Sequence, residues 1–293
     1  MSSALRIAHG SFGRVALLDM DRSLVRHAHP HCHVLIKAEG ADTHFSVGDD
    51  LIDLTDTQVV LVNAWQPHAY VHDPRRPRTI ILALYIEPEW LKLMRSNWAS
   101  SGLGGFFEQP AGEASPRIRN LASDLSTIMV ADPDAKPVHE QLLADLMIAV
   151  IERFTSWRTH PVSLRSAATA NRLDARIYRA VEIVRREPHL TSDVNALAKQ
   201  AGMSRANFYR LFESHAGMSP RMYINMVRLE MAVDAVVNSR DSLCRVSDRL
   251  GFSAPSHFTR FFRDHAGVRP SEFRSVAQIG QMDRIPVPSR NLA

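Results

Sequence analysis

Histidines that could bind a metal or a small molecule are concentrated in the first quarter of this 293-residue chain. Seven of the 14 histidines lie between His27 and His72, and the stretch HAHPHCH holds four of them at alternate positions. In an extended strand, side chains two residues apart point to the same face, so His27, His29, His31 and His33 would line one surface. Imidazoles suit zinc, iron, copper and nickel, and they also form hydrogen bonds with neighbouring groups. Both a metal site and a small-molecule pocket fit this pattern.

A later histidine, His68 in NAWQPHAY, gives the pattern a resemblance to the cupin barrel, in which a His-x-His pair and a third histidine meet at a metal. The cupin pattern also has a glutamate three or four residues after the second histidine. Here Glu39 follows His33 by six residues, so that carboxylate ligand is displaced or absent. A metal site, if one formed, would use His31, His33 and His68. Ordinary barrel side chains, hydrogen bonded to their neighbours, are a third interpretation.

Among these three interpretations we favour the small-molecule pocket, and we expect no metal and no cofactor. Ligands in barrels of this kind commonly sit among alternating inward-facing residues. The residues expected to line the pocket are His29, His31, His33, Trp65, His68 and Tyr70.

A sixteen-residue stretch occurs twice in the other half of the chain. FYRLFESHAGMSPRMY, from Phe208, returns 50 residues later as FTRFFRDHAGVRPSEF, from Phe258. Upstream of each copy, a small residue precedes a glycine by four positions, and a serine follows that glycine by two. This is the pattern of a helix-turn-helix, in which the small residue lets two helices cross closely, glycine adopts a positive-φ turn and serine caps the second helix. The chain is thus predicted to hold two such units.

Arginine at one position of both copies indicates a function beyond packing. Packing explains the repeated aromatic residues and glycines, whereas Arg210 and Arg260 recur outside the apolar face and could contact guanine or phosphate. Residues 172–275 carry 17 basic and 11 acidic residues, while residues 1–171 carry 16 and 19. This asymmetry favours DNA binding by the C-terminal region, since phosphate neutralisation drives that affinity.

The elements expected to position these residues change along the chain. Short apolar and β-branched segments predict an antiparallel barrel or sandwich; they span 14–20, 33–38, 44–47, 58–62 and 78–86. Helical periodicity begins at Pro88 and returns in a run of amphipathic segments. The predicted helices are 116–130, 138–157, 175–187, 194–201, 205–215, 220–239, 243–250, 255–265 and 271–277. The fold class is therefore α+β.

The C-terminal sequence, in particular SPRMYINMVRLEMAVDAVVNS and VSDRLGFSAPSHFTRFFRDHAGVRPSEFR, resembles the signature region of the AraC/XylS family of bacterial transcription regulators. The resemblance implies two helix-turn-helix subdomains bridged by a long helix, which bind asymmetric promoter sites. It also implies an N-terminal cupin-like barrel that binds an effector, helices that dimerise, and contact with RNA polymerase. One departure is Ser247, where the family usually has alanine at the helix crossing.

Position by position, the resemblance implies two sets of DNA contacts. The first recognition helix would present Arg205, Ala206, Asn207, Tyr209 and Arg210. The second would present Pro255, Ser256, Thr259 and Arg260, with Arg263 farther along the helix as a phosphate contact.

We expect the following domain organisation. Residues 1–157 form the sensor, with a cupin-like β-barrel over about 1–100 and dimerisation helices over about 115–157. Residues 158–173 form a linker, residues 174–277 the double helix-turn-helix domain, and residues 278–293 a tail. The longest apolar run, IILALYI, is too short to cross a bilayer, and the first residues lack the pattern of a secretion signal. With two cysteines 212 residues apart, a cytoplasmic protein without membrane contact is expected.

The sequence therefore predicts a DNA-binding transcription regulator, an effector-responsive activator rather than an enzyme. Its expected partners are double-stranded promoter DNA, a small-molecule effector, RNA polymerase and a second copy of the chain. Two alternatives remain open. One is a metal-dependent cupin enzyme, such as a dioxygenase or isomerase, with a helical accessory domain. The other is a helical adaptor that does not bind DNA.

Overall fold

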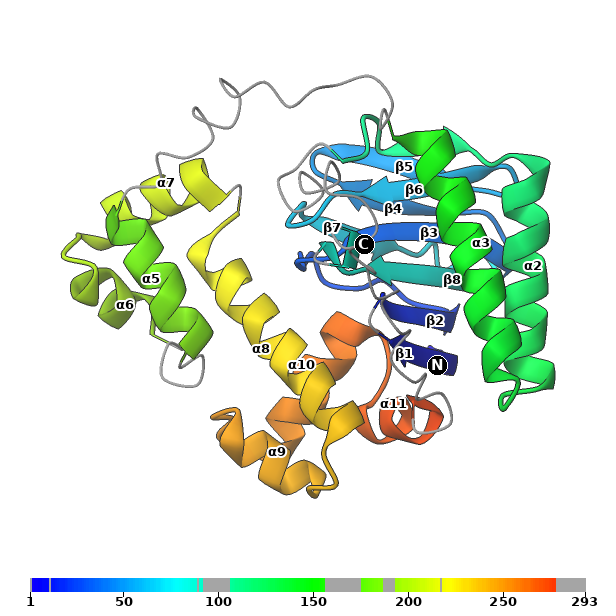
Figure 1. Cartoon of the computed structure of the whole chain (residues 1–293). Coiled ribbons are helices and arrows are strands. Elements are labelled where there is room, and N and C mark those ends of the chain that lie inside the picture. Colours follow the sequence, from blue (N-terminus) through cyan, green and yellow to red (C-terminus); the bar gives the residue numbers. More distant parts are fainter. Residues whose placement is uncertain are drawn as a thin grey trace, which may run out of the picture.

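The computed structural model describes residues 2–10, 12–88, 90–91, 106–155, 175–186, 193–216 and 218–277 (Figure 1). The predicted linker over 158–173 and the predicted tail over 278–293 lie outside these residues. Most of the helix expected after Pro88 also lies outside them.

The N-terminal region is built from two antiparallel sheets. The larger sheet has the strand order β1-β2-β8-β3-β6-β9 and the smaller sheet the order β5-β4-β7. No ladder among the described residues joins the two sheets, so closure into the expected barrel is not shown. The strands are β1 (Ser3–Gly10), β2 (Gly13–Met20), β3 (Cys32–Gly40), β4 (Thr43–Val47), β5 (Asp50–Leu54), β6 (Gln58–Val62), β7 (His68–Val71), β8 (Thr79–Ile86) and β9 (Ala111–Glu113).

Two helices, α2 (Pro116–Ala131) and α3 (Lys136–Phe154), lie side by side across one face of the larger sheet (Figure 1). Alternation along β3 explains this arrangement, since Val34 packs in the cluster with the helices while Leu35 packs on the opposite face. The predicted apolar stripe of α3 is buried in the same cluster, with Leu146 and Val150 fully enclosed. The helices thus complete the core of the N-terminal region.

The remaining helices are α5 (Ala175–Arg186), α6 (Val194–Gln200), α7 (Arg205–Ala216), α8 (Pro220–Asn238), α9 (Leu243–Arg249), α10 (Pro255–Ala266) and α11 (Pro270–Ala277). Each lies within one residue of its predicted bounds. The 19-residue helix α8 extends between the group α5–α7 and the group α9–α11 (Figure 1). At 1.5 Å per residue it is about 28 Å long. None of the described helices is long and apolar enough to cross a membrane.

Both helix-turn-helix turns have the predicted glycine geometry. Gly202 has φ 70° and Gly251 has φ 71°, the left-handed conformation that glycine adopts without a steric cost. The small residues that precede them, Ala198 and Ser247, are buried at 1% and 0% exposure. Two closely crossing helices leave room there for only a small side chain.

The predicted serine caps are correct in the first unit and wrong in the second. Ser204 accepts a hydrogen bond from the backbone N–H of Asn207 at 3.4 Å, at the start of α7. Helix α10 instead begins after Ala254, which makes no side-chain cap bond. Ser253 lies one residue too early to cap α10, and its Oγ lies 2.8 Å from Nδ1 of His257. Proline at the first position of α10 lacks an N–H and so reduces the need for a cap.

Candidate DNA-binding surface and histidine cluster

The helices α7 and α10 each bury an aromatic side and expose a polar one. Phe208 and Phe212 of α7, and Phe258 and Phe262 of α10, are fully buried. These pairs are spaced by four residues, so they lie on one face of each helix. Six of the expected DNA contacts are exposed: Arg205, Ala206, Arg210, Pro255, Ser256 and Arg260.

The other expected contacts are partly buried, and several have partners within the protein. Asn207 accepts a hydrogen bond from Arg210 at 2.9 Å, which holds the guanidinium over the surface of α7. Thr259 donates to the carbonyl of Pro255 at 2.9 Å. Arg263 bonds with the Asp264 carboxylate at 3.1 Å.

The remaining contact on α7, Tyr209, lies under the Arg205 guanidinium, with 5.6 Å between the guanidinium carbon and the ring centroid. The polar side of α7 is therefore organised by side-chain pairs, and both helices leave an arginine exposed at the repeated position.

Five histidines form one buried cluster where the two sheets approach the C-terminal helices: His27, His29, His31, His33 and His68. Each is at most 9% exposed, and neighbouring rings lie 4.5–6.0 Å apart between centroids. Burial, followed by the charge of neighbouring His68, holds the pKa of His27, His29 and His33 well below the ordinary value. Burial also lowers the pKa of His68 to about 4. These four imidazoles are therefore neutral at pH 7.

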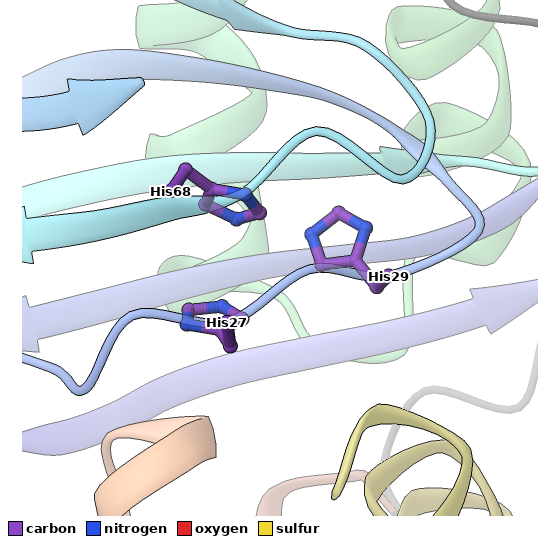
Figure 2. Close-up of side chains that lie close together, drawn as sticks. All are labelled: His27, His29 and His68. Carbon is purple, nitrogen blue, oxygen red and sulfur yellow. The ribbon is translucent and has the colours of Figure 1, made fainter. Parts of the chain in front are cut away.

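Within the cluster, His27, His29 and His68 bring one ring nitrogen each to within 4.8 Å of the other two (Figure 2). Of the three predicted metal candidates, only His68 belongs to this group. His31 is paired instead with Glu87, at 3.2 Å, and lies 3.9 Å from Glu230 of α8.

His33 and the two aromatic pocket candidates lie in separate environments. His33 stacks on Tyr85 of β8, with ring centroids 4.1 Å apart. Trp65 faces the C-terminal region and stacks on Tyr223 of α8 at 5.5 Å. Tyr70 is buried between the sheets, packs against Phe45 at 5.3 Å and bonds weakly to the carbonyl of Met20.

Several further contacts join the sheets to the C-terminal helices. The Val25 N–H donates to the carbonyl of Asp264 in α10 at 3.3 Å, and Arg22 donates to the carbonyl of Gly267 at 3.4 Å. Helix α11 packs along β1, where His9 and Phe273 have ring centroids 6.4 Å apart. The histidine cluster is thus next to the junction of the two regions.

A cavity of about 160 Å³ lies at this junction, between the strands and α8. Its lining includes basic groups of the N-terminal region and the carboxylates of Glu230 and Asp234 on α8. The lining residues are His9, Gly13, Arg14, His31, Glu230, Val233, Asp234, Val237 and Asn238.

Sequence reasoning missed three residues at this junction: Arg14, Tyr85 and Glu230. The Arg14 guanidinium lies 3.7 Å above the ring centroid of Tyr85. Tyr85 comes from a strand 50 residues beyond the histidine stretch, and Glu230 from a helix almost 200 residues away. Arg14 carried no motif, and the polar Tyr85 within the apolar run of β8 was the one available signal.

Comparisons with known proteins agree with this two-part architecture. A family model described as an AraC-like ligand binding domain matches residues 12–148, and one described as a helix-turn-helix domain matches residues 197–275. An uncharacterized HTH-type transcriptional regulator of Haemophilus influenzae is 33% identical over 106 residues, 36% of each chain. The Msm operon regulatory protein of Streptococcus mutans is 27% identical over 169 residues, 56% of this chain and 58% of that protein. These matches span between about a third and three fifths of the relatives' own length.

Among solved structures, an apo variant of ToxT from Vibrio cholerae has the same fold, with a TM-score of 0.52, over 91% of this chain and 97% of that chain at 14% identity. The architecture and the two family models define a protein that joins a ligand-binding domain to a helix-turn-helix DNA-binding domain. The chain belongs to the AraC family of transcription regulators.

Proposed function

We propose that this protein is a one-component transcription regulator that activates promoters in response to a small-molecule effector. The observation that carries the proposal is the pair of arginines, Arg210 and Arg260, exposed at the repeated position of α7 and α10. A helix about 28 Å long separates the two helix-turn-helix units, close to the 34 Å of one DNA turn. Two recognition helices at this separation suit successive major-groove segments on one face of the duplex.

The two units would read different sequences. Their buried aromatic residues repeat, whereas Ala206 and Tyr209 of α7 correspond to Ser256 and Thr259 of α10. An alanine methyl can contact thymine, and serine and threonine can donate to or accept from several bases. An asymmetric promoter site follows from this difference.

The cavity between the strands and α8 supports an effector site. It is smaller than a typical drug-sized pocket, so it suits a small polar molecule. An occupant would contact Arg14 of the sensor and Glu230 of α8 at once, so its binding would favour some arrangements of the two regions over others. A ligand changes such an equilibrium only through its different affinity for the two arrangements.

We further propose that the protein forms a homodimer through α2 and α3. Three large apolar side chains on these helices are exposed: Val130 at 48%, Val138 at 47% and Ile148 at 41%. Dimerisation would cover them, and it would place two DNA-binding regions on one promoter. Binding to promoter DNA also implies a cytoplasmic location and contact with RNA polymerase. We propose no catalytic activity, since the curated relatives are transcription regulators.

Genome-wide mapping of binding sites tests the proposal. The wild-type protein should be enriched at a small set of promoters, and the Arg210→Ala/Arg260→Ala variant should lose this enrichment. Arg75→Ala is the matched control, because Arg75 is an exposed arginine of the sensor that pairs with Asp73. Unchanged enrichment in the double variant would support the helical adaptor instead. The genes beside the recovered sites would indicate the chemical class of the effector.

A further inference from the structure

The backbone holds three imidazoles of the cluster against one another. His27 and His68 lie directly opposite in an antiparallel bridge, with reciprocal N–H to O=C bonds of 2.9 and 2.8 Å. Residues paired in this way project their side chains to the same side, and their ring centroids are 4.5 Å apart. His29 is two residues beyond His27, and its ring centroid lies 4.8 Å from that of His68. Figure 2 shows the three rings close together.

Hydrogen bonds determine which nitrogen of each ring carries the proton. In His27, His29 and His68, Nδ1 lies 2.8, 3.1 and 2.9 Å from the carbonyl oxygen of a residue two positions away. A carbonyl oxygen can only accept, so each Nδ1 must be the protonated nitrogen. Because the rings are neutral, each Nε2 then carries a free lone pair. Histidines that bind metals are oriented by this same type of bond from the other ring nitrogen.

The hydrogen bonds within the cluster leave part of this acceptor capacity unused. Nδ1 of His33 lies 3.1 Å from Nε2 of His29 and can donate to it. Nε2 of His68 is buried and has no hydrogen-bond partner among the described residues, and the same is true of Nε2 of His33. Buried polar atoms are rarely left without a partner in native proteins. A cation at this place would use the lone pair of His68.

The donor set indicates the class of ion. Three neutral nitrogens and no carboxylate make up the group, which favours borderline transition metals over magnesium or calcium. A tetrahedral zinc ion with bonds of 2.0–2.1 Å would have ligand nitrogens about 3.3 Å apart. One ring nitrogen of each histidine already lies within 4.8 Å of the other two, so displacements of about 1 Å in the ring positions would bring the ligands to this spacing.

We propose that His27, His29 and His68 bind one divalent transition-metal ion through Nε2, with Zn²⁺ as the preferred ion and an open fourth position. The site lies in the sensor, next to the cavity that His31 lines. His33, whose ring centroid is 5.4 Å from that of His68, would lose its bond to His29 when the metal enters.

Metal titration of the tag-free, full-length protein tests the proposal. After removal of metal with a chelator, Zn²⁺ is added in competition with a chromophoric indicator, and Co²⁺ is added separately to record its visible ligand-field bands. The wild type should bind one equivalent of Zn²⁺ per chain, and Co²⁺ should give the intense bands of four-coordinate geometry. His29→Ala and His68→Ala should each weaken Zn²⁺ binding more than about 100-fold, since loss of an outer-shell partner alone costs about 10–100-fold.

Two further variants control for histidines outside the cluster and for misfolding. His44→Ala is the matched control, because His44 is a partly exposed histidine of β4 bonded to Asp53, and it should retain one equivalent. His68→Gln keeps a polar side chain of similar size, so it should preserve the far-UV circular dichroism while losing the metal. Absence of stoichiometric Zn²⁺ binding in the wild type would overturn the proposal. Unchanged affinity in folded His29 and His68 variants would overturn it equally.

Discussion

Replacing Ser247 by alanine should stabilise the protein. Ser247 lies in α9, which packs against α8 and α10, and its side chain is fully buried. Its Oγ makes no hydrogen bond with any described residue. Ala198 occupies the equivalent position in the first helix-turn-helix unit and is 1% exposed. The repeat therefore supplies an internal comparison of the two side chains in one environment.

The expected gain follows from the desolvation of that hydroxyl. A buried polar group without a partner costs about 1–3 kcal/mol. Alanine removes this cost, although it also removes the packing contacts of one atom, so the net gain should be about 1–2 kcal/mol. For a region of about 100 residues this corresponds to a rise in Tm of about 4–10 °C. The reverse change, Ala198→Ser, should lower the stability of the first unit by a similar amount.

Thermal unfolding followed by circular dichroism at the helical band measures both variants against the wild type. Hydrogen exchange of peptides from α6 and α9 assigns each change to its own unit. An unchanged or lower Tm for Ser247→Ala, together with an Ala198→Ser variant as stable as the wild type, would refute the reasoning. That result would mean that the hydroxyl is solvated in both environments.

Three other predictions concern DNA, protons and assembly. Arg210→Ala and Arg260→Ala should each weaken DNA binding, as measured by fluorescence anisotropy. An arginine that contacts a base should cost about 1–3 kcal/mol of specific binding, and one that contacts a phosphate should reduce the slope of log K against log salt by about 1. No change in either quantity would contradict the assignment. Burial, then the charges of Arg14 and His31, lower the pKa of His9 to about 3, so the unfolded chain binds more protons than the native state between pH 6.5 and 3. His9 should therefore lower the free energy of unfolding by up to about 1.4 kcal/mol for each pH unit of acidification in this range. Urea titrations of His9→Gln should lack that contribution. Ile148→Glu should convert the proposed homodimer to a monomer in sedimentation velocity, and a variant that stays dimeric would place the interface elsewhere.

Most of the helical architecture was predictable because its signals are local. Apolar residues recur at helical spacing, and prolines stand at the first helical position of α2, α8 and α10. The strands β1, β5, β7 and β9 were not predicted. β5 exposes Leu51 at 62% and so lacks a buried alternating face, and β9 has three residues. Such strands depend on their partners in the sheet rather than on their own sequence.

The candidate site was predictable only in part. The alternation of HAHPHCH predicted that its histidines share one face of an extended strand. Their rings do cluster, but β3 begins only at Cys32, so the first three histidines of the stretch lie outside it. Which three meet depends on the bridge between His27 and His68, a contact between residues 41 positions apart. No local pattern specifies that register, and none indicated that Glu230 of α8 would approach the cluster.

The backbone of Trp65 is strained at the junction of the two regions. Among the described residues it is the one non-glycine with positive φ, at 67°, and its N–H donates to the carbonyl of His29 at 2.8 Å. A left-handed conformation costs a residue of this kind about 1–2 kcal/mol, and the stacking on Tyr223 helps to offset that cost. The contact between Trp65 and Tyr223 therefore joins the two regions through a residue whose own backbone conformation is strained.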